Sequence, residues 1–314
     1  MIRPPHRFSL LEPIDSVTHA HLVLAAAREV QRRPRTESVR LLDVGCGDGR
    51  LLLAMVRHLP GLIGRPIAPS GFDVSDSAVQ QRGFFKQTED RLQAAAPEIA
   101  WAGRLALRTV SEPWPAADGE VDLAITNQVL EHIENLPRFL SELARVLAPG
   151  GIALNLFPTV KSIVEGHIGV PWSHRIRSDD VRRAYLEHFA KAGLARLGPL
   201  RMDAELDPRE WARSRSDYLR SETWYRSWSE IADAAKAAHL HASYRWTPDF
   251  YLLKLAYVLR QPTLVRYSSR RRSALVDALL FSVFQRLASV SICFEKSSSY
   301  DPGDVRASTC ETVE

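Results

Sequence analysis

The sequence predicts an α/β fold built around a parallel sheet, and three adjacent features of one stretch predict it. Residues 39–44 are a short apolar run, as expected of a strand that is covered on both faces. Glycines at 45, 47 and 49 follow directly and allow a sharp turn in which no Cβ blocks a ligand. Residues 50–58 then have a helical pattern. This order of elements forms a nucleotide-type site at the carboxyl edge of a parallel sheet.

The spacing of the glycines favours a ligand without phosphate groups. A dinucleotide site needs Gly-x-Gly-x-x-Gly, whereas the third glycine here comes one residue early. Asp48 lies within the turn and Asp43 lies near the end of the strand, so two carboxylates belong to this site. They would repel a pyrophosphate but attract a positively charged ligand. S-adenosylmethionine carries a sulfonium, an ammonium and no phosphate, and it is the cofactor we expect.

The composition of the 314 residues excludes few classes of function. The 41 basic and 37 acidic residues give a net charge of +4, which is too small to indicate nucleic acid as a partner. Three cysteines, Cys46, Cys293 and Cys310, show neither metal nor disulfide spacing. The N-terminus has no apolar signal core, and no apolar run is long enough to cross a bilayer. We therefore expect a soluble, cytoplasmic protein.

Five regions follow one another along the chain. Residues 1–35 are expected to be an arm and a helix (16–33) that covers a sheet edge or the mouth of the cofactor site. The further regions are the cofactor-binding core (36–157), a helical substrate-side insertion or lid (158–226), the completion of the core sheet (227–296) and a disordered tail (297–314).

The elements of the core are predicted from apolar runs and the turn residues between them. Residues 60–70 are expected to be a Pro/Gly loop, and residues 71–73 to end the second strand. Ser75 or Asp76 is expected to cap the helix that follows. The other elements expected here are a helix over 77–96 and strands over 105–110, 121–126 and 152–157.

Asp73 lies at the tip of the second strand, beside the glycine turn. Its carboxylate offers two acceptor oxygens in one plane, which fits the two hydroxyls of a ribose. A role as a simple turn former is the alternative. Glu112 follows the third strand in a loop stiffened by two prolines, and it either contacts an adenine or belongs to a rigid surface turn.

Four motifs together carry a resemblance to a known family: D-V-G-C-G-D-G (43–49), G-F-D-V-S (71–75), D-L-A-I-T-N-Q-V-L-E-H-I (122–133) and L-A-P-G-G-I-A-L (147–154). Over about residues 39–157 the chain resembles class I S-adenosylmethionine-dependent methyltransferases. It looks most like the methyltransferase type 11-like branch, which acts on small molecules, sugars and lipids. The resemblance implies a Rossmann-like, seven-stranded, mostly parallel sheet with helices on both faces.

The resemblance also implies which residues bind the cofactor. The first motif would hold the methionine end through Asp43, Gly45 and Gly47. Asp73 of the second motif would take the ribose diol, and Asn127 of the third would lie next to the amino group. The other positions expected at this site are Cys46, Val74, Glu112 and Gln128, with Glu112 or its neighbours flanking the adenine.

The family-typical end of the sheet is also visible in the sequence. Residues 227–240 open with a capping box, Ser227 with Glu230, and continue as an alanine-rich helix. Residues 241–247 are the expected sixth strand. Residues 290–295 alternate in polarity and are expected to form the last, antiparallel strand.

Three side chains are candidates for the base that takes a proton from an acceptor hydroxyl. His132 lies one turn past the fourth strand, and Glu131 precedes it. His167 belongs to the insertion, which leaves the fifth strand at the end where acceptors sit in this fold. Packing is the alternative role for these histidines. No metal is expected, because Glu165 with His167 and His174 lacks another well-spaced ligand.

We expect methyl transfer to a small-molecule, sugar or lipid-linked acceptor, at oxygen. Amino-group methylation of nucleic acids or glutamine commonly uses Asn-Pro-Pro-aromatic after the fourth strand, and Asn127-Gln128-Val129-Leu130 departs from that pattern. A nicotinamide-dependent oxidoreductase is one alternative. A non-catalytic cofactor-binding or membrane-surface scaffold is the other.

Two further segments bear on partners. The basic cluster from Arg266 to Arg272 precedes an apolar helix over about 273–287, which can make peripheral contact with an anionic membrane. Burial of this helix against the sheet is the expectation we favour. Residues 207–228 mix aromatic and basic side chains, and they form either a lid that grips the acceptor or a helical subdomain with a small core of its own.

Overall fold

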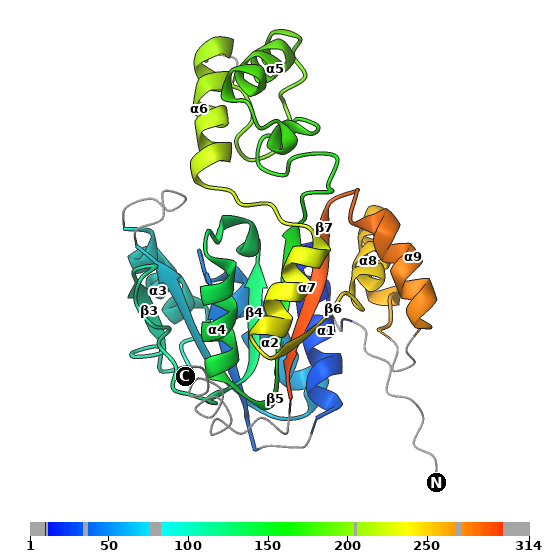
Figure 1. Ribbon diagram of the computed structural model, residues 1–314. Helices are drawn as coiled ribbons and strands as arrows, with labels where there is room; N and C mark the ends of the chain where they lie inside the picture. The colour runs from blue at the N-terminus through cyan, green and yellow to red at the C-terminus, as the bar shows by residue number, and fades with distance from the viewer. Residues whose placement is uncertain are drawn as a thin grey trace, which may run out of the picture.

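The computed structural model describes residue 10 and residues 12–33, 37–75, 83–203, 206–267 and 272–297. Within them a seven-stranded sheet has the order β3-β2-β1-β4-β5-β7-β6 (Figure 1). Strand β7 is antiparallel to both of its neighbours, and the other pairs are parallel. This confirms the predicted fold class. The strands are β1 (Val39–Val44), β2 (Ile67–Val74), β3 (Leu105–Arg108), β4 (Val121–Asn127), β5 (Leu147–Pro158), β6 (Leu240–Ser243) and β7 (Ser289–Lys296).

Helices cover both faces of the sheet. Neighbouring strand residues such as Leu41 and Leu42 belong to different cores, because successive side chains of a strand point to opposite faces. Helices α1, α2 and α8 close the core of Leu41, and α4 and α7 close that of Leu42. The helices are α1 (Val17–Gln31), α2 (Arg50–Ile63), α3 (Phe84–Ala95), α4 (Leu136–Val146), α5 (Asp179–Lys191), α6 (Pro208–Ser221), α7 (Trp228–Ala237), α8 (Thr247–Val258) and α9 (Ala274–Phe284), with short 3₁₀ turns η1 (Leu130–His132), η2 (Ser173–Arg175) and η3 (Pro262–Leu264).

Local signals in the sequence account for several boundaries. Strand β1 has the bounds predicted for it. Ser16 caps α1, and its hydroxyl accepts the His19 N–H at 3.4 Å. Both halves of the predicted capping box, Ser227 with Glu230, are present at the start of α7. These contacts satisfy N–H groups that the first turn of a helix leaves without a partner, so they depend on nearby sequence alone.

The predicted loop over 60–70 is wrong. Helix α2 continues through Pro60 to Ile63 and ends at Gly64, whose φ is +68°, and β2 begins at Ile67. The helix is retained because Leu59 and Ile63 extend its buried apolar face. Helix α3 begins at Phe84, so most of the helix predicted over 77–96 is present. The candidate cap Asp76 lies outside the described residues, as do the first nine residues of the expected arm and the tail from 298 onward.

The segment between β5 and α7 rises from the carboxyl edge of the sheet (Figure 1). Helices α5 and α6 pack together there around a core of their own, in which Leu186, Trp211 and Leu219 are buried. The prediction of a small separate core is therefore confirmed for Trp211. Tyr218 and Tyr225 are partly buried against the same core, and both also contact His167.

Helix α9 departs from the expectation that it is buried against the sheet. Phe281 is the one residue of α9 that is buried. The helix packs on the edge formed by α8, where the rings of Tyr251 and Phe284 stack with centroids 4.3 Å apart. Most of its apolar surface faces outward. Among the described residues, no helix is both long and apolar enough to cross a membrane.

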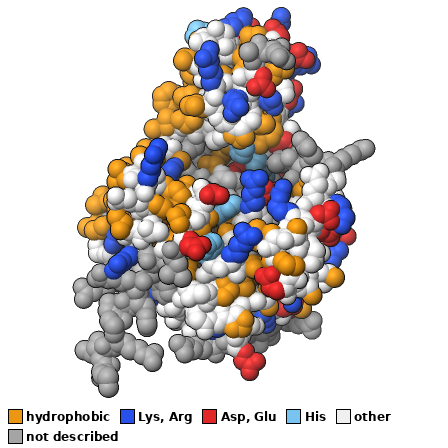
Figure 2. Space-filling model, turned by 180° about the vertical axis from the view of Figure 1, so that it is seen from behind, with side chains coloured by type: hydrophobic (Ala, Val, Ile, Leu, Met, Phe, Trp, Pro, Cys, Tyr) orange, Lys and Arg blue, Asp and Glu red, His pale blue; other side chains and the backbone are white. Residues whose placement is uncertain are grey.

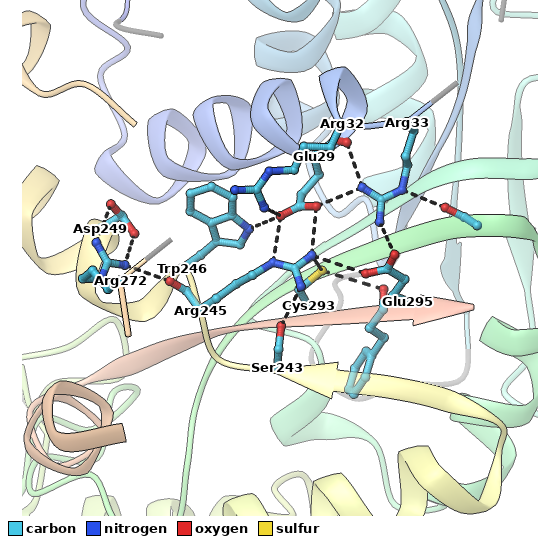
Figure 3. A network of polar contacts seen from close by, with 12 residues as sticks. Glu29, Arg32, Arg33, Ser243, Arg245, Trp246, Asp249, Arg272, Cys293 and Glu295 are labelled. Carbon is cyan, nitrogen blue, oxygen red and sulfur yellow. Dashed lines mark hydrogen bonds and ion pairs between the residues drawn. The ribbon is translucent and has the colours of Figure 1, made fainter. Parts of the chain in front are cut away.

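A buried ionic network joins the first helix to the last strands (Figure 3). The carboxylate of Glu29 in α1 accepts bonds from Arg33 at 2.9 Å, Arg245 at 2.8 Å and the indole of Trp246 at 2.8 Å. Arg33 also pairs with Glu295 of β7 at 3.1 Å. The network therefore connects α1 to β7 and to the segment between β6 and α8.

Candidate active site

The glycine turn lies where three parallel strands end together. In the register of the sheet, Asp43 of β1 stands beside Gly71 of β2 and Ile125 of β4. Gly45 has φ +73°, and a Cβ added there would lie 2.7 Å from Val129. A Cβ added at Gly47 would meet no atom within 4 Å. One glycine is therefore required by packing, whereas the other leaves open space in which a ligand can approach the backbone.

Asp73 connects the turn to the tip of β2. One carboxylate oxygen accepts the Gly47 N–H at 2.6 Å, and the other accepts the Val74 N–H at 2.7 Å. Burial raises the pKa of Asp73 above its ordinary value, although these two hydrogen bonds oppose the shift. The structure thus places Asp73 against the glycine turn, as the sequence predicts. Its role toward a ribose stays a prediction.

Two buried acceptor atoms without a hydrogen-bond partner lie at the ends of neighbouring strands. They are Oδ2 of Asp43 in β1 and Oδ1 of Asn127 in β4. Burial raises the pKa of Asp43 well above its ordinary value, and the nearby Asp73 and Asp48 add to the shift. Buried acceptors are costly when they lack a donor. An ammonium group brought to Asp43 would supply a donor and would favour its ionised form.

Asp48 does not face the site as an isolated charge. Its carboxylate accepts the Arg50 N–H at 3.2 Å, and it pairs with the side chains of Arg50 and Arg91 at 3.0 and 3.5 Å. The N-cap of α2 is Gly49, so Asp48 does not cap this helix. Because it is paired with two arginines, Asp48 would repel a pyrophosphate less than an isolated carboxylate would. The charge of the site rests on Asp43 and Asp73 instead.

The remaining predicted cofactor residues differ in how they relate to the glycine turn. Cys46 is buried, its N–H binds the Phe72 carbonyl, and burial raises the pKa of its thiol. Gln128 has φ +59° and donates its side-chain amide to Ser289, away from the turn. Glu112 is exposed in the loop after β3, where it accepts the Thr109 N–H at 2.5 Å. No hydrogen bond in the described part of the chain joins Glu112 to the glycine turn.

Two threonines that the sequence did not single out support the site. Thr88 of α3 donates its hydroxyl to the Gly47 carbonyl at 2.7 Å. Thr18 of α1 accepts the side-chain amide of Asn127 at 3.5 Å. Only the prediction that the first helix covers a sheet edge or the cofactor mouth pointed toward Thr18. No pattern in the sequence indicated Thr88.

The three predicted catalytic candidates come together in one cluster. Glu131 and His132 lie in η1, directly after β4, and His167 lies in the insertion. One ligand atom from each lies within 4.8 Å of the others. The imidazole centroids of His132 and His167 are 5.0 Å apart. Val129, which lies against Gly45, precedes Glu131 by two residues, so the segment that carries Glu131 and His132 starts beside the glycine turn.

Each histidine of the cluster is held through Nδ1. His132 Nδ1 lies 2.6 Å from the Glu222 carbonyl oxygen, and His167 Nδ1 lies 2.8 Å from Glu165 Oε1. Because a carbonyl or carboxylate oxygen only accepts, Nδ1 is the donor in both rings. When either ring is neutral, the lone pair is therefore on Nε2. Both rings thus keep one nitrogen available for a substrate.

The two histidines differ in the direction of their pKa shifts. Burial lowers the pKa of His132 below its ordinary value, and the Glu222 carbonyl opposes this shift only in part. Burial would also lower the pKa of His167, but the hydrogen bond and the charge of Glu165 outweigh it and raise that pKa. Tyr225 donates a hydrogen bond to Glu165 as well. Glu165 of the insertion thereby makes His167 easier to protonate than His132.

Glu131 is the most deeply buried member of the cluster. Its side chain is 1% exposed, and both carboxylate oxygens lack a hydrogen-bond partner. Burial raises the pKa of Glu131 to about 8. A small cavity of about 10 Å³ adjoins it, hardly more than one water molecule requires. At neutral pH the group is therefore mainly a neutral carboxylic acid that can donate one hydrogen bond.

Glu131, His132 and His167 also have the ligand types and spacing that can hold a metal ion. The set of metal ligands considered from the sequence was a different one, Glu165 with His167 and His174, and no metal was expected there. In the structure Glu165 is occupied by His167 and Tyr225, and His174 contacts the Val160 carbonyl at 3.2 Å. The geometry therefore favours the first set over the second.

Comparisons with known proteins identify the family of the chain. A family model described as methyltransferase domain matches residues 18–200, more than half of the chain. The chain is similar to the ubiquinone biosynthesis O-methyltransferase of Caulobacter sp. (strain K31), with 27% identity over 169 residues, 49% of this chain and 60% of that protein. It is also similar to the sterol 4-C-methyltransferase strm-1 of Caenorhabditis elegans, with 28% identity over 150 residues, 48% of this chain and 38% of that protein. The chain spans about half the length of the curated relatives it matches.

Two solved structures that match the chain have low sequence identity to it. PKMT2 from Rickettsia typhi in complex with AdoHcy has a TM-score of 0.49 and 13% identity, over 92% of this chain and 55% of that one. The YcgJ protein from Bacillus has a TM-score of 0.44 and 14% identity, over 88% of this chain and 99% of that one.

Proposed function

Since the chain belongs to the methyltransferase domain family, whose cofactor is S-adenosylmethionine, we propose that it transfers a methyl group from this cofactor to an oxygen of a small-molecule, sugar or lipid-linked acceptor. The observation that carries the proposal is the cluster of Glu131, His132 and His167, which keeps Nε2 of both imidazoles available; the segment of its first two residues starts beside the glycine turn.

The residues at the strand tips fit the cofactor. Its ammonium group matches the unpartnered oxygens of Asp43 and Asn127. The open space at Gly47 leaves room for the backbone to approach it, and Asp73 is proposed to take the ribose hydroxyls. When bound, the cofactor supplies a methyl group that is already activated on a sulfonium. The chain therefore has to align the acceptor and remove its proton.

The two histidines are proposed to have different roles at the acceptor oxygen, one as a base and one as a hydrogen-bond donor. His132 has a lowered pKa, so it is neutral at pH 7 and its Nε2 takes the hydroxyl proton as the new oxygen–methyl bond forms. His167 has a raised pKa and donates from Nε2–H to the same oxygen, which stabilises the negative charge that develops there. Neighbouring groups whose pKa values are shifted apart are typical of acid–base pairs. Glu131, as a neutral acid, is proposed to help orient the acceptor.

Two observations support oxygen as the acceptor atom. One relative is named as a ubiquinone biosynthesis O-methyltransferase, although the relatives also include a sterol 4-C-methyltransferase. The residues after β4 lack the Asn-Pro-Pro segment that is common where amino groups of nucleic acids or glutamine are methylated. A hydroxyl acceptor also gives the two histidines a proton to remove and an oxygen to bind.

The test is transfer of label from methyl-labelled S-adenosylmethionine into lipid and small-metabolite extracts, followed by kinetics on the acceptor found. His132→Asn should slow turnover by roughly 10²-fold or more while cofactor affinity, measured by calorimetry, is unchanged. His188→Asn, in an exposed position on α5, is the matched control. Near-normal turnover of His132→Asn would remove it as the base. Loss of wild-type activity with a chelator would show instead that the cluster acts through a metal ion.

A further inference from the structure

Helices α8 and α9 present an unusually apolar outer surface. Hydrophobic side chains gather on the side of the molecule where these helices lie, at the left of Figure 2. Large exposed apolar patches on a protein of this kind mark an interaction site. We call this surface the α8–α9 face, and its exposed large apolar residues are Leu252, Leu255, Val258, Leu259, Leu264, Leu275, Val276, Leu279, Val283 and Leu287.

These side chains are unusually exposed for their type. Val258 is 77% exposed and Leu275 is 70% exposed. A helix that is apolar on all sides, as α9 is, is normally buried on all sides. Here the rings of Tyr251 and Phe284 join α9 to α8, Phe281 anchors it to the core, and the remaining apolar surface has no cover among the described residues.

The charge around the face is positive. Among the described residues from 247 to 290, five are lysine or arginine and two, Asp249 and Asp277, are acidic. Arg272 pairs with Asp277 at 2.7 Å and with Asp249 at 3.2 Å, so both acidic side chains are paired within the chain. Arg260, Arg266 and Arg286 are exposed. An apolar surface with a basic margin matches the interfacial region of a bilayer that contains anionic lipids.

The apolar surface continues toward the candidate active site. The Arg286 carbonyl, just past α9, accepts the Ile163 N–H at 2.8 Å, and the Ile163 carbonyl accepts the Trp172 N–H at 2.7 Å. Ile163, Val164 and Trp172 are themselves exposed. They flank the loop that carries Glu165 and His167. The exposed apolar residues therefore run from α9 to the loop that supplies one of the two histidines.

We propose that the α8–α9 face, extended by Ile163, Val164 and Trp172, binds the surface of an anionic membrane. The charge distinguishes this partner from a second copy of the chain. In a symmetric dimer the same patch would meet itself, so the basic margins would face one another and repel. An anionic lipid surface complements both the apolar centre and the basic margin.

This orientation brings the histidine cluster near the lipid surface, where an acceptor with a lipid tail would reach it without entering water. That consequence rests on the proposed methyl transfer. The membrane binding itself does not, because it depends on residues outside the cofactor site.

The test is flotation of the full chain with vesicles of phosphatidylcholine alone or with phosphatidylserine, at low and high salt. We expect binding to the phosphatidylserine vesicles that weakens as salt rises, because the basic margin is screened. The double variant L275E/L279E should bind at least about tenfold more weakly, since it places two charges in the apolar centre. Val181→Glu changes an equally exposed position on α5 and should bind as the wild type does.

Two controls separate this proposal from the proposed function. Circular dichroism checks that the variants are folded, and calorimetry with S-adenosylhomocysteine should give the same affinity for L275E/L279E as for the wild type. Failure of the wild type to float with anionic vesicles would overturn the membrane proposal and leave the methyltransferase assignment untouched. Sedimentation that shows a dimer, dissociated by L275E/L279E, would overturn it in favour of a second copy.

Discussion

His132 and His167 show how two identical side chains acquire different properties from their neighbours. His132 faces a neutral carbonyl and has a lowered pKa, whereas His167 faces the Glu165 carboxylate and has a raised pKa. The ion pair of His167 is buried, so it is screened less by solvent than a surface pair. The carboxylate that makes the difference belongs to the insertion.

The pH dependence of turnover should therefore be bell-shaped. The rate rises on the acid side as His132 loses its proton, below the ordinary histidine value near 6.5, and falls on the alkaline side as His167 loses its proton above that value. Glu165→Gln removes the negative partner, so the pKa of His167 falls and the alkaline limb should move to lower pH. The acid limb should move less, because the charge of Glu165 is the smallest of the contributions to the pKa of His132. Glu187→Gln on the surface of α5 is the control, and an unshifted alkaline limb in Glu165→Gln would contradict the assignment of His167.

Asp73 gives a second prediction at this scale. Asp73→Ala should weaken cofactor binding by on the order of 1.5–3 kcal/mol for each charge-assisted hydrogen bond lost to the ribose. Calorimetry with S-adenosylhomocysteine measures the change, and Asp48→Ala is the control, because Asp48 is paired with arginines on the exposed side of the turn. The free energy of unfolding of both variants shows whether the turn itself is weakened. Unchanged affinity for Asp73→Ala would refute the ribose role.

At the scale of elements, the site is a junction of strand, turn and helix. Glycines in this region differ in whether a larger residue could replace them. Gly45 lies against Val129 with a positive φ, so it joins the turn to the segment that carries His132. Gly61 lies inside α2, and a Cβ added there meets nothing within 4 Å. Tertiary packing therefore requires glycine at position 45 but not at position 61.

This contrast predicts opposite outcomes for one substitution. Gly45→Ala places a Cβ 2.7 Å from Val129 on a backbone that favours glycine, so the turn and η1 must move apart and cofactor affinity should fall at least tenfold. Gly61→Ala should leave affinity unchanged and stabilise the chain by about 0.5–1 kcal/mol, because alanine favours a helix more than glycine does. Calorimetry and chemical denaturation measure the two effects. Equal behaviour of the two variants would contradict this account of the turn.

At the scale of the whole molecule, the network of Figure 3 connects α1 to β7 and to the segment after β6. Glu29 is buried, and the groups bound to it come from Arg33, just past the end of α1, and from the segment between β6 and α8. Burial alone would raise the pKa of Glu29, but the charges and hydrogen bonds of Arg245 and Arg33 outweigh this and lower it. Helix α1 is thereby tied to Arg245, which lies 216 residues further along the chain.

Loss of this carboxylate should destabilise the fold. Glu29→Gln leaves buried arginines without their counter-charge and should reduce the free energy of unfolding by about 3–5 kcal/mol. Glu295→Gln, at the exposed margin of the network, should cost less than about 1 kcal/mol. Since the folded-state pKa of Glu29 is depressed, its contribution is present above the unfolded value near 4.5 and is lost as pH falls through the folded value. Denaturation at neutral and acid pH should therefore show a difference between wild type and Glu29→Gln that shrinks in acid.

The sequence by itself determined the features that depend on neighbouring residues. The bounds of β1, the capping box of α7 and the four ordered motifs are local patterns of apolar spacing, glycine and capping residues, and they led to the fold and the cofactor. The loop predicted at 60–70 failed because a buried apolar face outweighed the local signals of Pro60 and Gly61.

Only the tertiary structure decided which distant side chains meet. Glu131 and His132 on one side and His167 on the other were separate candidates, and no spacing rule joins η1 to a loop of the insertion. The support from Thr18 and Thr88, and the exposed position of α9, also depend on how elements pack. Periodicity tells which face of a helix is apolar but not what covers it, because burial and long-range contacts are properties of the assembled chain.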